Sequence, residues 1–297
     1  QGWLYYAESG DYERAWRELV KNNPLPALMG RVCYHPCENA CNRATLDEAV
    51  SIHAVERFLG DEARKNGWKF EVTSPASGKK VLVVGAGPAG LYFAALMKRH
   101  DPRHEITLYE RSPRNATWGF GVVFSDRALE FLRADDEDLY QYLTPHMENW
   151  THLSIQVNDT RIPITGNGFA ATGRLELLQL LYAYVERLGV QIHFDTEIDS
   201  LQALGEADLI VGANGAFSWV REQNADRFGT TCDWRPNKFI WYGTSQVFDS
   251  LSLTFRETEW GVFCAHHYRY SPRMSTFLVE VQDDTWQRAG FETRSPE

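Results

Sequence analysis

The sequence predicts an α/β fold in three parts: a helical segment that carries cysteines, a parallel-sheet domain with a dinucleotide-binding turn, and a terminal antiparallel sheet. Three observations predict it. A glycine-rich turn follows a buried strand at residues 81–90, three cysteines share one loop, and apolar and polar residues alternate after position 237. A chain of 297 residues is long enough for about two domains.

The first part is helical in pattern. Asp11 is the expected N-cap of a helix whose inner face carries Tyr12, Trp16, Leu19 and Val20. A second helix is expected over residues 47–59, with Val50, Ala54, Val55 and Phe58 facing inward. We expect a helical domain over 1–67, a linker over 68–79, a dinucleotide-binding domain over 80–236 and an antiparallel sheet over 237–297.

The segment VLVVGAGPAG is a strand that runs into a glycine turn and then a helix. Gly85 permits the tight turn, Gly87 lets the backbone approach a pyrophosphate, and Gly90 lets the helix pack close to the strand. Pro88 and Ala89 open the helix, whose N-terminus offers free N–H groups to phosphates. The pattern therefore predicts a Rossmann-like βαβ unit.

A second strand, ITLYE, ends on Glu110, which can accept hydrogen bonds from an adenosine ribose. Arg111 follows it and completes the predicted set at this edge. Further strands of this domain are expected at 192–194 and 209–211, and helices at 128–133 and 174–188. The later antiparallel strands are expected at 238–248, 252–256, 261–268 and 275–281.

Composition narrows the possible partners and compartment. A net charge of −10 argues against binding to nucleic acid or to an anionic membrane. No signal peptide is visible. The longest apolar run, residues 81–97, is short for a membrane span and has the pattern of a strand, a turn and a helix. The cysteine usage favours a reducing compartment, so we expect a cytoplasmic protein.

Cys33, Cys37 and Cys41 follow a C-x3-C-x3-C spacing in one loop. Thiolates at this density suit either an iron–sulfur cluster or zinc. Three ligands do not complete a four-ligand site, and His35 is near enough to serve in the zinc interpretation. Cys232 and Cys264 stand alone in the sequence and are expected in the core.

The stretch NPLPALMGRVCYHPCENACN resembles the N-terminal iron–sulfur domain of the glutamate synthase small subunit and of dihydropyrimidine dehydrogenase. The resemblance covers residues 1–67 and implies [4Fe-4S] clusters and a partner subunit. It places Cys33 and Cys37 on one cluster, with Glu56 at that cluster's non-cysteine ligand position, and Cys41 on the other cluster. The family's upstream cysteines are absent from this sequence.

Residues 79–292 resemble single-component FAD-dependent aromatic hydroxylases, notably salicylyl-CoA and aminobenzoyl-CoA hydroxylases and the tryptophan hydroxylase of violacein synthesis. The resemblance begins in LYFAALMKRHDPRHEITLYER and GFGVVFSDRALEFL. It continues through five separated motifs in order: GRLELLQLL, ADLIVGANGAFSWVR, NKFIWYGTSQVFD, AHHYRYSPRMSTFLVE and DDTWQRAG. It implies a cofactor site that includes Gly119 and Gly121 beside the flavin, Arg174 at the pyrophosphate, and the turn Asn214–Gly215. The family usually has Asp-Gly at that turn.

The same resemblance implies that an aromatic substrate lies against the antiparallel sheet. Trp241, Tyr242, Tyr268 and Met274 are candidates for its apolar wall. Strand alternation puts Trp241 and Tyr242 on opposite faces, so only one of them should line the site. For His266 and His267, a half-buried sheet position is favoured over a substrate contact.

Two functions follow. The longer resemblance implies a monooxygenase that uses FAD, NADPH and O2 to hydroxylate an aromatic substrate, and the shorter implies an iron–sulfur flavoprotein that passes electrons from NADPH to a partner subunit. The chain begins at Gln1 inside a helical pattern and lacks the hydroxylases' later Gly-Asp segment, so we expect a fragment cut at both ends. A gene fusion or an assembly artefact would each produce the junction between the two resemblances.

Overall fold

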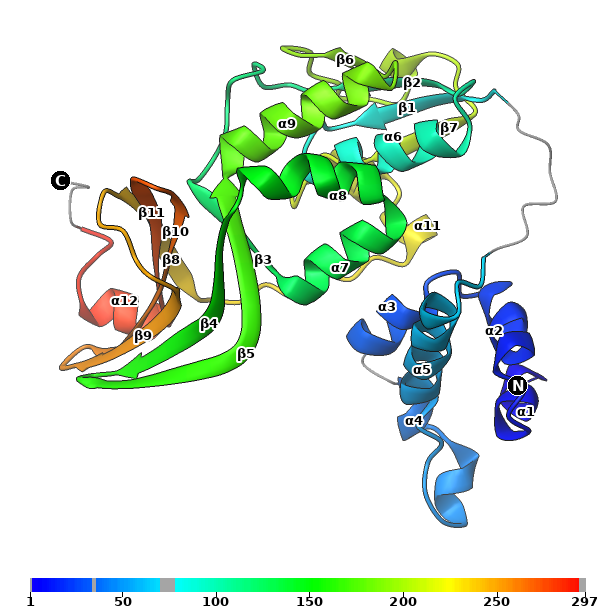
Figure 1. Ribbon diagram of the computed structural model, residues 1–297, viewed down its shortest axis with the longest axis horizontal. Coiled ribbons are helices and arrows are strands. Elements are labelled where there is room, and N and C mark those ends of the chain that lie inside the picture. The colour runs from blue at the N-terminus through cyan, green and yellow to red at the C-terminus, as the bar shows by residue number, and fades with distance from the viewer. Residues whose placement is uncertain (1, 34–35, 70–77, 294–297) are drawn as a thin grey trace. The chain divides into compact units, whose positions relative to one another are not determined.

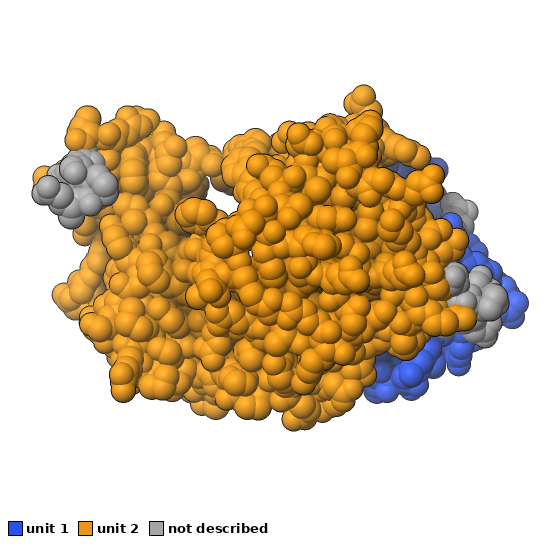
Figure 2. Space-filling model, turned by 90° about the horizontal axis from the view of Figure 1, so that it is seen from above, with its two compact units in different colours: residues 1–75 blue, residues 76–297 orange. Residues whose placement is uncertain are grey.

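A computed structural model describes residues 2–33, 36–69 and 78–293. The chain forms two compact units, residues 1–75 and 76–297, which Figure 2 shows in different colours. The predicted residue His35 lies outside the described residues, as does most of the predicted linker.

The first unit is helical. Its helices are α1 (Gly2–Glu8), α2 (Tyr12–Val20), α3 (Pro26–Val32), α4 (Pro36–Asn39), η1 (Asn42–Thr45) and α5 (Ile52–Lys65). Asp11 is the N-cap of α2, as predicted, and its side chain accepts a hydrogen bond from the Arg14 N–H. The small core consists of Ala15, Trp16, Leu19, Leu59 and Ala63. Trp68, assigned to the linker from sequence, packs beside it, 6.0 Å from Trp16 between ring centroids.

The prediction for the second helix was wrong at both ends and at Phe58, whereas Val55 packs against the core as expected. The helix α5 spans Ile52–Lys65, and Asp47 lies in a preceding turn where its carboxylate accepts hydrogen bonds from Arg43 and from the Glu48 N–H. Leu59, Gly60 and Ala63 face inward, whereas Phe58 is exposed. The helix axis passes so close to α3 that a Cβ atom on Gly60 would overlap the backbone of Ala27.

The second unit contains a parallel sheet in the order β6-β2-β1-β7. Its strands are β1 (Lys80–Val84), β2 (Glu105–Tyr109), β6 (Gln191–His193) and β7 (Leu209–Gly212), all near their predicted positions. The helices α6 (Pro88–His100) and α9 (Arg174–Arg187) bury Leu91, Leu178 and Val185 in the main core beside Val81 and Val83. This is the predicted Rossmann-like arrangement (Figure 1).

A seven-stranded sheet follows the order β3-β5-β4-β9-β10-β11-β8. Its predicted strands are β8 (Lys238–Thr244), β9 (Leu251–Thr258), β10 (Gly261–Ser271) and β11 (Met274–Val281). Sequence patterns missed β3 (Gly121–Ser125), β4 (Glu148–Val157) and β5 (Thr160–Gly173). The sheet is therefore not built from residues 237–297 alone, since β4 pairs in parallel with β9. Strands β4 and β5 form the long curved hairpin in green in Figure 1.

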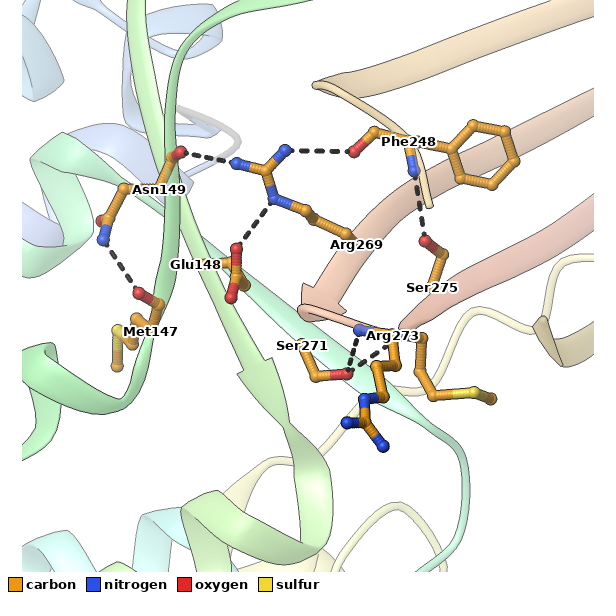
Figure 3. Close-up of polar contacts among 9 residues, drawn as sticks. Met147, Glu148, Asn149, Phe248, Arg269, Ser271, Arg273 and Ser275 are labelled. Carbon is orange, nitrogen blue, oxygen red and sulfur yellow. Dashed lines mark hydrogen bonds and ion pairs between the residues drawn. The ribbon is translucent and has the colours of Figure 1, made fainter. Parts of the chain in front are cut away.

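Arg269 joins the two halves of this sheet (Figure 3). Its Nε donates to the Glu148 carboxylate at 2.8 Å, and its other nitrogens donate to the carbonyls of Asn149 and Phe248 at 3.3 and 3.5 Å. The guanidinium also lies over the Trp150 ring, 5.9 Å from its centroid. One side chain of β10 therefore holds the start of β4 against the loop before β9.

The remaining helices of this unit are α7 (Asp126–Asp135), α8 (Glu137–Leu143), η2 (Thr144–His146), η3 (Gln202–Leu204), α10 (Trp219–Gln223), α11 (Ala225–Phe228) and α12 (Asp283–Arg288). The expectation of core positions for the isolated cysteines was wrong for Cys232, which is exposed, while Cys264 is half-buried. In the described part of the chain, none of the helices has both the length and the apolarity of a bilayer span.

Candidate functional site

The glycine turn borders a cavity of about 250 Å³ at the carboxyl ends of β1 and β2. Gly85 has φ of +105°, and a side chain there would press on the backbone of Ala213 and Asn214. Gly90 lies so close to the Gly85 carbonyl and to Val83 that a Cβ would not fit. By contrast, a Cβ on Gly87 would meet nothing within 4 Å, because it would enter the open space above the helix N-terminus. These are the positions that the fingerprint predicts.

Glu110 follows β2 and lines the same cavity. Its carboxylate accepts hydrogen bonds from the Ala86 N–H at 3.0 Å and the Ser112 N–H at 2.9 Å. Each carboxylate oxygen can accept a second hydrogen bond, so the group can still bind ribose hydroxyls. The backbone contact with Ala86 fixes the carboxylate beside the glycine turn.

Arg174 begins α9 and lines both this cavity and an adjoining one of about 110 Å³. Its backbone N–H donates to the Phe120 carbonyl at 2.7 Å. Its buried Nε, and the buried Oγ1 of Thr117 in the smaller cavity, have no hydrogen-bond partner among the described residues. Because unsatisfied buried donors are costly, this pair indicates a polar or anionic ligand.

The turn at Asn214–Gly215 closes the far side of the cavity. Gly215 has φ of +86°, and the Asn214 side chain accepts a hydrogen bond from Ser218 at 2.5 Å. Asn214 and Ser218 therefore hold the turn by a hydrogen bond between two neutral side chains, which adds no charge to the cavity. Arg111 lines the cavity as well, so the structure brings together most of the predicted cofactor residues: Gly85, Gly87, Glu110, Arg111, Arg174, Asn214 and Gly215.

Sequence reasoning did not single out the aromatic residues around this cavity. Tyr109, Trp118, Phe217 and Trp219 line it, and Trp118 and Phe217 are 79% and 77% exposed. The available signal was their closeness in the sequence to the predicted site residues Glu110, Gly119 and Gly215. Exposed aromatic rings beside a polar cavity are typical of sites that stack on a heterocycle.

A larger cavity of about 370 Å³ lies among α6, α7, α8 and α9. Its polar lining groups are the Tyr92 hydroxyl and the Asp135 carboxylate, which lie 3.4 Å apart. Burial, followed by the nearby Asp135 charge, raises the pKa of Tyr92. This lining has nothing to bind phosphates, whereas the cavity of about 250 Å³ contains the predicted cofactor residues.

Gly119 and Gly121 do permit close approach, but the groups that approach them are aromatic side chains of this chain. With φ of +95°, Gly119 lies against the Trp241 ring, and Gly121 lies against Tyr270. The Gly121 N–H donates to Thr276 Oγ1 and its carbonyl accepts from the Tyr268 hydroxyl, both at 2.8 Å.

These contacts define one side of the seven-stranded sheet, here named the loop face, which carries Trp241, Tyr268 and Thr276. Trp241 therefore lies next to the predicted cofactor segment, whereas Tyr242 points to the opposite face and is 51% exposed. Tyr268 is buried, and burial raises its pKa to about 12. Met274, the first residue of β11, is half-buried.

The adjacent histidines of β10 lie on different faces. His267 is buried on the opposite face, where its Nε2 lies 2.9 Å from Thr254 Oγ1 and Phe248 and Phe277 flank its ring. Burial, followed by the charge of Arg161, lowers its pKa to about 4. His266 is half-buried on the loop face, 3.5 Å from Cys264 Sγ and 3.7 Å from a Glu280 carboxylate oxygen.

The cysteine loop is arranged differently from the glycine turn. Cys33 and Cys41 are half-buried and Cys37 is exposed. Within the described ranges, no three His, Cys, Asp or Glu side chains converge to hold a metal ion. Burial raises the pKa of Glu56, and N–H groups of Val50 and Arg43 lower that of Cys41. The metal role of these residues stays a prediction.

Two family models match the chain. One, described as dihydropyrimidine dehydrogenase domain II with a 4Fe-4S cluster, matches residues 1–68. The other, described as an NAD(P)-binding Rossmann-like domain, matches residues 83–132. The first confirms the predicted resemblance of the N-terminal part, and the second confirms that of the βαβ unit.

Individual relatives also fall into two groups, one of aromatic monooxygenases and one that includes glutamate synthases. Salicyloyl-CoA 5-hydroxylase of Streptomyces sp is 41% identical over 217 residues, which is 73% of this chain and 42% of that protein. Protodeoxyviolaceinate monooxygenase of Chromobacterium violaceum is 33% identical over 73% of this chain and 59% of its own length. The glutamate synthase [NADPH] small chain of Bacillus subtilis is 39% identical over 38% of this chain and 22% of its own.

A solved structure of 2-methyl-3-hydroxypyridine-5-carboxylic acid oxygenase shares the fold, with a TM-score of 0.58 at 20% identity over 69% of this chain and 59% of that one. The chain spans about half the length of the curated monooxygenases that it matches. Both predicted resemblances are thus confirmed: most of the chain is similar to FAD-dependent aromatic monooxygenases, and its first 68 residues are similar to a 4Fe-4S domain.

Proposed function

We propose that residues 76–297 bind FAD and form the cofactor half of a flavin-dependent aromatic monooxygenase. The observation that carries this proposal is the cavity of about 250 Å³ in which Gly87, Glu110 and Arg174 meet. It combines an open helix N-terminus, a carboxylate held by backbone N–H groups, and a buried guanidinium nitrogen that has no partner among the described residues.

The pyrophosphate and the adenosine ribose of FAD each have matching groups. The N-terminus of α6 and Arg174 would hold the pyrophosphate, since free N–H groups and a guanidinium both favour anions. Glu110 would accept hydrogen bonds from the ribose. The flavin, reduced by NADPH, would supply the oxygen-activating chemistry. Trp241 and Tyr268 would form part of the wall that orients the aromatic ring and excludes water.

The first test is FAD binding by the chain itself. We expect flavin fluorescence to be quenched on binding and the flavin to remain with the protein through gel filtration. A chain that folds, as judged by circular dichroism, but retains no flavin at micromolar concentration would contradict the proposal.

The second test concerns the complete protein. We propose that it hydroxylates an aromatic substrate, an aryl thioester or an indole-type molecule, with NADPH and O2. NADPH oxidation that depends on such a substrate and yields a product heavier by one oxygen atom is expected. Oxidation that yields only hydrogen peroxide would contradict hydroxylation.

The alternative is an iron–sulfur flavoprotein that passes electrons from NADPH to a partner subunit. The match of residues 1–68 to a 4Fe-4S domain favours it. Electron transfer to a partner without oxygen insertion, together with bound iron and sulfide, would support this second function. The greater length of the monooxygenase similarity makes hydroxylation our choice.

A further inference from the structure

The loop face carries a polar group that the proposed function has not yet used. Cross-strand registration places Trp241, Leu278 and His266 in one row, because Leu278 pairs with both of the others. Tyr268 lies in the next row, two residues along β10 from His266, a separation of about 7 Å. That spacing is close to the width of one aromatic ring.

His266 does not stand alone. Its Nε2 lies 3.7 Å from Glu280 Oε2 and 3.5 Å from Cys264 Sγ. The other carboxylate oxygen of Glu280 accepts a hydrogen bond from the Asn237 side chain at 2.8 Å, which holds the carboxylate in place. His266 and Glu280 are each between a third and two fifths exposed, so a ligand can reach them.

A cavity of about 470 Å³ on the same face is lined by Glu280 and Cys264, but not by His266. Its lining mixes apolar and polar groups, among them Phe255, Val262, Cys264, Glu280 and Asn237. A cavity of this size and mixed lining is typical of small-molecule sites. The loop face therefore offers an apolar row near the cofactor segment, then a histidine–carboxylate pair, then a cavity.

We propose that His266, supported by Glu280, accepts the proton of a phenolic hydroxyl on the aromatic substrate, whose ring lies along the row of Trp241 and Leu278. This deepens the proposed function and rests on it. The substrate O–H bond breaks, an N–H bond forms on the His266 imidazole, and the ring is left as an electron-rich phenolate. Glu280 stabilises the imidazolium by its opposite charge.

The other titratable groups near His266 do not compete for this proton. Burial, followed by the Glu280 charge, raises the pKa of Cys264, so its thiol stays protonated. His267 lies on the opposite face, and its pKa of about 4 leaves that ring neutral at neutral pH. These two directions agree with the proposal that His266 takes the proton on the loop face.

The test uses 4-nitrophenol, whose anion absorbs visible light, with the full chain and at a pH below the range in which the free phenol ionises. We expect bound nitrophenolate absorption with the unaltered chain. His266→Gln should abolish that band and weaken binding about tenfold, the effect of one charge-assisted hydrogen bond. Glu280→Gln should reduce the band without abolishing it. His100→Gln, the same change at an exposed helix position, should leave the band unchanged.

4-Nitroanisole separates proton acceptance from simple packing, because it has the same ring without an acidic O–H. It should bind equally to the unaltered chain and to His266→Gln. An unchanged anion band in His266→Gln, an equal loss of 4-nitroanisole binding, or failure of the unaltered chain to bind 4-nitrophenol would each overturn the proposal.

Measuring FAD retention in the same variants distinguishes failure of the proton-acceptor role of His266 from failure of the proposed function. If FAD binds normally but the anion band does not depend on His266, only the present inference fails. If the band depends on His266 but no flavin binds, the proposed function fails, and the phenol site loses its assignment as the substrate site of a monooxygenase.

Discussion

The glycine turn and the cysteine loop are both short motifs with clear chemical meaning, but they differ in whether their residues converge on one site. Gly85, Gly87, Glu110 and Arg174 converge on one cavity, while Cys33, Cys37 and Cys41 do not converge with a further ligand among the described residues. The glycine site is built by backbone geometry, which strands and a helix impose. A cluster site is held together by the bonds to its metal.

Strand pairing positions the glycine site independently of any ligand. The parallel pairing of β1 with β2 and β7 sets the positions of the turn, of Glu110 and of Asn214. Among the described residues around the cysteines, which lie in short helical turns between α3 and α5, the structure has no strand pairing. We therefore expect the first site to be preorganised and the second to depend on its cofactor.

The largest effect should come from Gly90→Val. The new side chain would overlap the Gly85 carbonyl and press on Val83 and Ala213, both 3.2 Å from the added Cβ. We expect the free energy of unfolding of residues 76–297 to fall by about 3 kcal/mol or more, measured by urea denaturation. A midpoint equal to that of the unaltered chain would show that this turn is not tightly packed.

Gly87→Val is the matched change at the open position of the same turn. Gly87 has φ of −72° and ψ of 174°, which any residue adopts, and its Cβ would meet no atom within 4 Å. Stability should therefore stay within about 0.5 kcal/mol. FAD affinity should fall about a hundredfold, because the valine would occupy the pyrophosphate position. Unchanged flavin retention would place the cofactor elsewhere.

Arg174→Ala should weaken FAD binding about tenfold without lowering stability, because its buried Nε has no partner to lose. Fluorescence titration measures the FAD affinity and thermal melting measures the stability.

Glu110→Ala should also weaken FAD binding, but with a loss of stability, since its carboxylate accepts hydrogen bonds from the Ala86 and Ser112 N–H groups. Arg187→Ala, at the other end of α9, is the control and should not change flavin affinity.

The smallest effect on stability should come from replacing Cys33, Cys37 and Cys41 together by alanine. The core of the helical unit consists of Trp16, Leu19, Leu59 and their neighbours and includes none of these thiols. We expect the melting of metal-free protein to be unchanged, whereas iron and sulfide uptake on anaerobic reconstitution should be lost. Stoichiometric zinc in the unaltered protein, in place of iron, would contradict the cluster assignment.

Local patterns predicted much of the fold. The periodicity of two located β8–β11, and the glycine fingerprint located β1, α6 and β2. The missed strands β3, β4 and β5 carry weaker signals: β5 contains a proline and three glycines, and its first half is exposed. Such a strand is stabilised by its neighbours β3 and β4 and not by its own composition.

The sequence by itself determined the glycine turn, its acidic partner and the alternation that separates Trp241 from Tyr242, because each depends on residues close together in the chain. Only the tertiary structure decided that Gly119 receives Trp241 and that Arg174 leaves a buried nitrogen unpaired. It also decided that Cys264, His266 and Glu280 share a face, since strand register is set by pairing between distant segments.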